Sequence, residues 1–125
     1  MLIDSNIIIY ASQPEHAFLR RLIARHAPAV SAVSYVEVLG YHRLSLEARR
    51  YFTALFEAST LLPISRAVLD SAVSLRQQRR ISLGDALIAG TALVHQRTLV
   101  TRNSQDFDWI PELSLLNPFA EGTNV

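Results

Sequence analysis

The sequence predicts an α/β fold, a three-layer α/β/α domain with a mostly parallel central sheet of about five strands. Short apolar runs alternate along the chain with longer segments whose apolar residues repeat at the helical period. Several of the helical segments begin at a serine, a residue that often caps the start of a helix. Alternation of strands and helices is typical of a mostly parallel sheet covered by helices on both faces.

In the first half of the chain, a strand begins each repeat of the pattern. Pro14 suits the first turn of a helix because it has no backbone N–H to leave unpaired. Glu37 follows Ser34 at the spacing of a capping box, which predicts a helix start at Ser34. We therefore expect strands over residues 1–4 and 29–33, helices over 5–11, 14–26 and 34–40, and a fourth helix that opens at Ser45.

The second half continues the alternation. Ser82 and Asp85 repeat the capping-box spacing, and the helix that follows is rich in alanine and glycine, which indicates close packing on the sheet. We expect strands over 60–64, 98–101 and 113–116, helices over 65–79 and 83–96, a helical turn that starts at Asn103, and a tail over 117–125.

Length and composition limit the class of protein. A chain of 125 residues fits one domain, over residues 1–125, and its 50% hydrophobic and 18% charged content is typical of a globular protein. No apolar run approaches the roughly 20 residues that span a bilayer. The N-terminal residues lack the pattern of a signal peptide, and cysteine is absent, which excludes disulfides and thiolate metal sites. We therefore expect a cytoplasmic protein.

The net charge of +1 is too small to predict nucleic-acid binding by itself. All 12 basic residues are arginine, whose planar group of donors matches phosphate oxygens. A GC-rich genome produces the same bias toward arginine, so this observation carries little weight.

Three acidic residues fall where predicted strands end. Asp4 ends the first strand, Glu37 lies in the predicted first turn after the second, and Asp106 lies in the turn after the fourth. In an open parallel sheet these junctions share the carboxyl edge, where such folds bind ligands. Asp85 starts a helix preceded by a loop, so topology alone does not bring it there.

Each of these acids has a simpler interpretation as a helix cap, favoured by the helix dipole. The set argues for more, because three of the acids would crowd one edge and the chain has no lysine to neutralise them. Clustered carboxylates raise one another's pKa or hold a hard cation. Ligation by oxygen alone suits Mg²⁺ or Mn²⁺ and disfavours Zn²⁺.

Four segments resemble the signature blocks of PIN-domain nucleases. They read LIDSN at 2–6, SYVEV at 34–38, LGDALIA at 83–89 and VTRNSQDF at 100–107. The chain length and the closing IPEL at 110–113 with Asn117 and Pro118 resemble the small toxin branch, the VapC type of toxin–antitoxin pairs. Each block alone is weak, but four blocks in order at fitting distances are specific, and the resemblance covers the whole chain.

The resemblance implies a site made of four carboxylates that bind Mg²⁺ or Mn²⁺. By position, Asp4, Glu37, Asp85 and Asp106 match the acidic quartet of the family, so Asp85 is expected in the same pocket. Asn103 matches a position that is Asp or Asn in relatives, and an Asn there gives the site one charge fewer. Ser5, Asn6 and Thr101 are candidate hydrogen-bond donors to the ligands, and Asp108 is a nearby extra acid that we do not assign.

The implied function is a metal-dependent endoribonuclease that is the toxin of a toxin–antitoxin pair. Two alternatives stay open at this point. A site of this kind does not read the 2′-hydroxyl, so the substrate can be DNA, and the acids of a non-catalytic interaction module would be helix caps only. Arg79, Arg80 and Arg102 are candidate contacts to phosphates beside the pocket, whereas Trp109 is better interpreted as a packing residue.

The resemblance also implies a homodimer and a cognate antitoxin that blocks the acidic pocket. A sequence feature points the same way, because large apolar side chains are concentrated in the third and fourth predicted helices. A domain of this size does not easily bury all of them, and exposed apolar patches usually mark interfaces. These side chains are Tyr41, Leu44, Tyr51, Phe52, Leu55 and Phe56.

Overall fold

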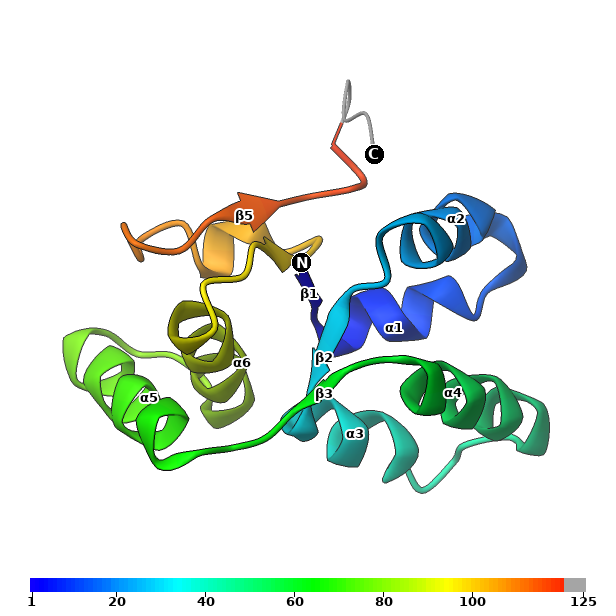
Figure 1. Ribbon diagram of the computed structural model, residues 1–125, viewed down its shortest axis with the longest axis horizontal. Helices are drawn as coiled ribbons and strands as arrows, with labels where there is room; N and C mark the ends of the chain where they lie inside the picture. The colour runs from blue at the N-terminus through cyan, green and yellow to red at the C-terminus, as the bar shows by residue number, and fades with distance from the viewer. Residues whose placement is uncertain (121–125) are drawn as a thin grey trace.

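A parallel sheet of five strands forms the centre of the protein (Figure 1). The structure, a computed structural model, describes residues 1–120. All four strand pairs are parallel, and the spatial order of the strands is β3-β2-β1-β4-β5. The strands are β1 (Leu2–Ile3), β2 (Ala29–Ser31), β3 (Leu61–Leu62), β4 (Leu99–Val100) and β5 (Leu115–Leu116).

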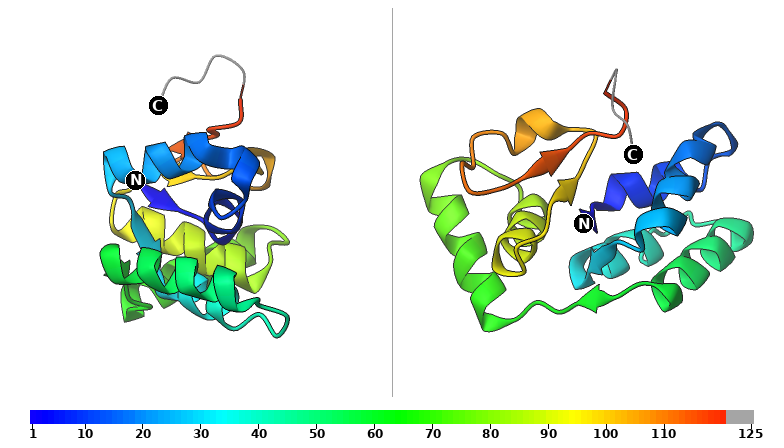
Figure 2. Two further views of the ribbon diagram at one scale, coloured as in Figure 1. Left: turned by 90° about the vertical axis from the view of Figure 1, so that its right-hand side faces the viewer. Right: turned by 45° about the horizontal axis from the view of Figure 1, so that its top comes forward.

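Helices connect the strands and cover both faces of the sheet. Figures 1 and 2 show α1, α2, α3 and α4 on one side of the strands and α5 and α6 on the other. The bounds are α1 (Ser5–Ala11), α2 (Ala17–His26), α3 (Ala32–Leu39), α4 (Leu46–Ala58), α5 (Arg66–Gln78) and α6 (Leu83–Val94), with short 3₁₀ helices η1 (Pro14–His16) and η2 (Ser104–Asp106). The expected three-layer α/β architecture with a parallel five-stranded sheet is therefore confirmed.

Each face of the sheet has its own hydrophobic core. Successive side chains on a strand point to opposite faces, so Leu2 joins the core under α5 and α6 while Ile3 joins the core under α1, α2 and α4. Both residues are completely buried. A strand buried on both faces has no polar alternation, which explains why the strands appear in the sequence as short continuous apolar runs.

The start of α3 differs from the prediction. Ser31, not Ser34, is the N-cap: its backbone is extended and its hydroxyl accepts a hydrogen bond from the Val33 backbone N–H at 3.1 Å. The helix begins as soon as β2 ends, so residues 32 and 33 are helical and the expected strand over 29–33 is shorter. Ser34 lies inside the helix and is fully buried, and Glu37 lies in the second turn rather than in a capping box.

The other serine caps are where the sequence predicts them. Ser45, Ser65 and Ser82 each accept a hydrogen bond from the backbone N–H three residues later. The strands and α6 are shorter than expected by two or three residues.

The predicted tail is wrong for residues 117–120. Pro118 is buried and Phe119 is half-buried against the core that α1 and α2 cover. The remaining residues of the predicted tail, 121–125, lie outside the described part of the chain. Within residues 1–120, no helix combines the length and the apolar character needed to cross a bilayer.

Candidate metal and phosphodiester site

Asp4 lies between the end of β1 and the start of α1. Its carboxylate Oδ1 accepts a hydrogen bond from the Ile7 backbone N–H at 2.9 Å, so it does cap α1. Only 7% of the residue is exposed. Burial raises the pKa of the Asp4 carboxyl, hydrogen bonds from the Thr101 side chain and the Ile7 backbone oppose this, and the negative charge of Asp85 raises the pKa further. The residue is therefore both a cap and a neighbour of another acid.

Asp85 occupies the third position of α6, and its backbone N–H donates to the Ser82 Oγ at 3.1 Å. Partial burial is the largest cause of a raised pKa for its carboxyl, and a hydrogen bond from the Ser82 side chain opposes the rise. The charges of Asp106 and Glu37 raise that pKa as well. Asp85 therefore interacts electrostatically with three acids: Glu37 and Asp106 raise its pKa, and its own charge raises the pKa of Asp4. It is the acid that links the group.

Glu37 is exposed on α3, but its carboxylate is held in place. The Ser5 hydroxyl donates to Glu37 Oε1 at 2.7 Å and lies 2.9 Å from the hydroxyl of the buried Ser34. A hydroxyl has one proton, so Ser34 must donate to Ser5 while Ser5 donates to Glu37. The other oxygen, Oε2, lies over the start of α6, 2.9 Å from where a Cβ on Gly84 would be.

Asp106 lies in η2, the turn that follows β4. The Asn103 carbonyl accepts from the Asp106 backbone N–H at 3.0 Å, and the Asn103 backbone N–H donates to the Thr101 Oγ1 at 3.2 Å. The Trp109 Nε1–H donates to the Asp106 carbonyl at 2.9 Å. Trp109 packs against the core under α5 and α6, which agrees with its interpretation as a packing residue. Asn103 and Asp106 are exposed.

The four predicted acids therefore share one electrostatic neighbourhood at the carboxyl edge. Asp108 does not appear among the charges that act on Asp4 or Asp85. Among residues 1–120, no ion pair involves any of the four acids, and no group of three or more carboxylate or histidine side chains is placed so that it could hold a metal ion. Buried carboxylates without a cationic partner are costly. In chemical type, carboxylates with hydroxyls beside them are the ligands that Mg²⁺ and Mn²⁺ prefer, so the donor set suits such an ion although the side chains do not yet converge on one point.

Sequence reasoning missed two contributors to this neighbourhood. Ser34 has the sequence features of a helix cap. The signal that it is buried is its spacing from the apolar residues Val33 and Val38, one residue before it and four after it, which places it on the buried face of the helix. The sequence around Gly84 does not indicate a role in the site. Gly84 matters because the Glu37 carboxylate occupies the space that a side chain at residue 84 would need.

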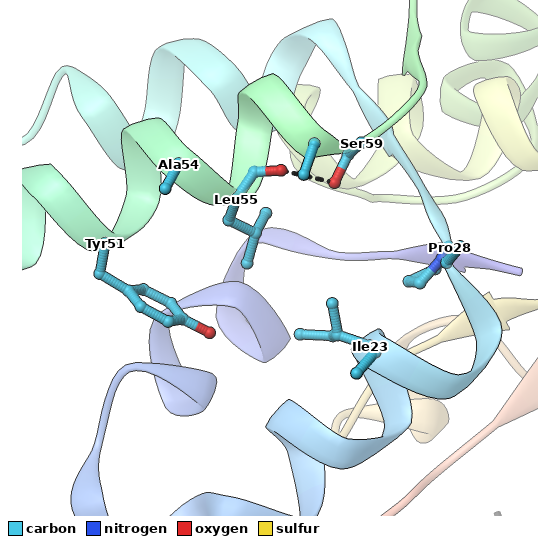
Figure 3. Close-up of a pocket in the computed structure, with 9 residues that line it drawn as sticks. Ile23, Pro28, Tyr51, Ala54, Leu55 and Ser59 are labelled. Carbon is cyan, nitrogen blue, oxygen red and sulfur yellow. Dashed lines mark hydrogen bonds between the residues drawn. The ribbon is translucent and has the colours of Figure 1, made fainter.

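An apolar groove begins at this edge and runs between α1, α3 and α4. It has a volume of about 440 Å³ and is lined by Glu37 together with Ile9, Val38, Leu44, Phe52 and other residues of these elements. A second groove of about 420 Å³ separates α2 from α4 and is lined by Ile23, Tyr51 and Leu55, among others (Figure 3). The second groove contains no acidic residue, so it is not the site of metal-dependent chemistry.

The large apolar side chains of the third and fourth helices are only partly exposed. Phe52, Leu55 and Phe56 are buried, and the other three are not, so, as expected, the domain does not bury the whole set. Tyr41 is 54% exposed at the mouth of the first groove, and Leu44 and Tyr51 are half-buried in the groove walls.

Comparisons with known structures place this fold beside those of several toxin–antitoxin complexes. A chain of a toxin–antitoxin complex from Klebsiella pneumoniae matches with a TM-score of 0.78 and 28% identity, over 94% of this chain and 97% of that chain. A chain of FitAcB from Neisseria gonorrhoeae matches with a TM-score of 0.70 and 25% identity, over 94% and 96%. VapBC2 from Rickettsia felis, bound to a DNA fragment from its promoter, matches with a TM-score of 0.77 and 23% identity, over 93% and 96%.

A comparison with curated protein sequences gives no match. A family model described as "PIN domain" matches residues 1–113, a range that contains all four acids, the whole sheet apart from β5, and every helix. The resemblance to VapC-type PIN proteins, inferred from the four sequence blocks, is confirmed by these matches. With the parallel sheet and the acids at its carboxyl edge, this match shows that the chain belongs to the PIN domain family.

Proposed function

We propose that the protein is a Mg²⁺- or Mn²⁺-dependent endoribonuclease and the toxin of a toxin–antitoxin pair. Nuclease activity is typical of PIN domains. The observation that carries the proposal is the raised pKa of Asp4 and of Asp85, caused by burial and by the charges of the other acids, with no basic partner for any of them within residues 1–120. Such a group of charges needs a cation.

Asp4, Asp85 and Asp106 would hold the ion. A divalent cation there supplies positive charge that stabilises the phosphate oxygens and the leaving oxygen, and it lowers the pKa of water. Glu37 has one oxygen engaged by Ser5, which fixes the direction of the other, Oε2. That oxygen can either join the ligands or accept the proton of the attacking water, and both roles require the fixed position that Ser5 and Ser34 provide.

The test is cleavage of single-stranded RNA and single-stranded DNA of the same sequence, with Mg²⁺, with Mn²⁺ and with a chelator. Asp4→Asn and Asp85→Asn should each abolish cleavage and leave the fold intact, because Asn removes a ligand charge but still caps a helix. Asp70→Asn is the matched control, since Asp70 is an exposed carboxylate on α5 that pairs with Arg66, at 3.4 Å.

Full activity in either site variant would refute the metal site. Cleavage of the DNA but not of the RNA would mean that the protein is a deoxyribonuclease and not a ribonuclease. Intact RNA and DNA in every condition, together with a loss of stability in Asp4→Ala but not in Asp4→Asn, would support a non-catalytic module whose acids are caps.

The proposed antitoxin binds the groove between α1, α3 and α4. This groove is apolar along most of its length, which suits an amphipathic or extended peptide, and it ends at a carboxylate, Glu37. A basic side chain at the end of such a peptide would pair with the acid cluster in place of the metal ion. A similar fold occurs in the toxin–antitoxin complex from Klebsiella pneumoniae, which supports this part of the proposal.

A further inference from the structure

Phe119 is the centre of an aromatic cluster that joins the end of the described chain to the start of the molecule. Its ring makes edge contacts with the rings of Tyr10, His16 and Phe18, at centroid distances of 5.3, 5.2 and 5.1 Å. These three residues belong to α1, η1 and α2, in that order. Phe119 is therefore packed against α1, η1 and α2, and Asp4 is the N-cap of the first of these helices.

Arg102 is held by the same segment in two ways. Its guanidinium carbon lies 4.2 Å from the centroid of the Phe119 ring and 5.2 Å from that of Tyr10, a cation–π arrangement. Its backbone carbonyl accepts a hydrogen bond from the Asn117 Nδ2 at 3.2 Å. The Phe119 backbone N–H donates to the Asn117 Oδ1 at 2.9 Å, which fixes the orientation of the Asn117 amide.

The neighbours of Arg102 in sequence belong to the acidic site. Thr101, before it, is buried and bonds to the Asp4 carboxylate, and Asn103, after it, accepts the backbone hydrogen bond that shapes the turn carrying Asp106. Pro118 and Phe119 make no contact with these acids that the structure records. Phe119 and Asn117, by contrast, both contact Arg102 directly.

We propose that Asn117 and Phe119 are positioning residues for the metal site. By holding the main chain and the side chain of Arg102, they fix the distance between Asp4, at the end of β1, and Asp106, in η2. Supporting contacts of this kind commonly change metal affinity by about 10- to 100-fold when they are removed. The inference rests on the proposed metal-dependent function, and it concerns residues beyond the range that the family model matches.

The test is titration of the full-length protein with Mn²⁺ by calorimetry in the absence of RNA, beside hydrogen exchange of the segment 101–107. Phe119→Leu removes the ring, and Arg102→Lys keeps the charge but loses the planar group that stacks on it. Both should weaken Mn²⁺ binding by about 10-fold and speed exchange in this segment. Phe119→Tyr keeps the ring and should restore both values to those of the wild type.

Phe56→Leu is the matched control. It removes the same ring from α4, where Phe56 is more deeply buried and contacts Tyr35 rather than Arg102. This variant should lose at least as much stability as Phe119→Leu, yet keep the Mn²⁺ affinity and the exchange rates at 101–107.

Wild-type affinity in Phe119→Leu and Arg102→Lys would overturn the positioning role, as would equal losses of affinity in Phe56→Leu. If the wild type and both variants bind Mn²⁺ equally well and cleave RNA equally well, the positioning role is refuted but the proposed function stands. A wild-type protein that binds no Mn²⁺ would refute the proposed function and this inference with it.

Discussion

At the scale of single residues, the contact between Gly84 and Glu37 is the sharpest constraint on the site. A methyl group on residue 84 would lie 2.9 Å from the Glu37 Oε2, which is the free end of a flexible side chain. The carboxylate can move away at little cost, but it then leaves the position that Ser5 and Ser34 set.

Gly84→Ala should therefore separate stability from activity. Alanine is the better helix former by about 1 kcal/mol, so the melting temperature should stay level or rise slightly. Cleavage of RNA should fall by about 100-fold, the cost of a small misplacement of a reacting group. Thermal melts and initial rates measured on the same preparation test this. Unchanged rates would mean that the position of Glu37 does not matter for the reaction.

The buried carboxyl of Asp4 and the partly buried carboxyl of Asp85 should give the metal-free protein an unusual dependence on pH. Burial raises the folded-state pKa of Asp4 and of Asp85 above the ordinary value of 3.8, so the folded protein binds more protons than the unfolded chain in the window above that value. Stability is then highest at the acidic end of this window and falls as the pH rises through the raised pKa values.

Urea denaturation at several pH values in the presence of a chelator measures this effect. Asp4→Asn should flatten the decline above pH 3.8, and saturating Mn²⁺ should flatten it too, because bound metal favours the ionised carboxylates. A decline in stability with pH that is as steep in Asp4→Asn as in the wild type, without metal, would contradict the raised pKa of Asp4.

At the scale of elements, the pair α5 and α6 depends on a close approach at Gly90. A Cβ there would lie 3.1 Å from the Val68 carbonyl oxygen and 3.3 Å from the Ala72 backbone nitrogen, both in α5. Unlike the Glu37 side chain, this backbone cannot move independently. Small residues on this face of α6 therefore set the separation of the two helices.

Gly90→Ala should destabilise the fold by about 1–3 kcal/mol, the usual cost of overpacking, although alanine has the higher helix propensity. Gly84→Ala, in the same helix, supplies the comparison: chemical denaturation should show opposite signs for the two variants. A stabilised Gly90→Ala would mean that α5 shifts freely against α6.

Elements were predictable from sequence where a local signal decided them. Ser45, Ser65 and Ser82 gave the helix starts correctly because a capping serine acts only on its own turn. Two good capping residues, Ser31 and Ser34, lie three positions apart, and tertiary structure chose Ser31 since the buried Ser34 hydroxyl bonds to Ser5 from another element. The packing of Phe119 was equally invisible, because its partners lie about a hundred residues earlier in the chain.

The candidate site was predictable in membership but not in arrangement. Three junctions between strands and helices placed Asp4, Glu37 and Asp106 at one edge by topology. Asp85 came only from the resemblance, and the structure supports its place through the charges that act on it. The position of Glu37 depends on Ser5, Ser34 and Gly84, a relation between three elements that no single sequence window contains.

At the scale of the whole molecule, exposed apolar surface predicts assembly. Tyr35, Val36 and Leu46 are 46%, 69% and 66% exposed on α3 and α4. We expect a homodimer, measured by size-exclusion chromatography with light scattering. A monomer at high micromolar concentration would contradict it.

The proposed antitoxin gives a separate prediction. The product of the neighbouring open reading frame should bind the protein and inhibit cleavage. Tyr41 and Glu37 line the same groove, so Tyr41→Glu places a second negative charge on its apolar surface. This variant should weaken binding by about 10-fold or more. Pull-down and cleavage assays measure both effects. If the enzyme stays active and unbound in that mixture, the antitoxin proposal is refuted and the nuclease proposal stands.

The order of the strands decides when the site can be assembled. β1 is synthesised first but lies in the middle of the sheet, and its neighbour β4 comes almost a full chain later, with Leu2 paired to Leu99. Contacts across such a separation form late in folding. A chain emerging from the ribosome therefore presents Asp4 and Glu37 well before Asp85 and Asp106. If the protein cuts RNA as proposed, the messenger and the ribosome that produce it meet no complete site until translation has nearly finished.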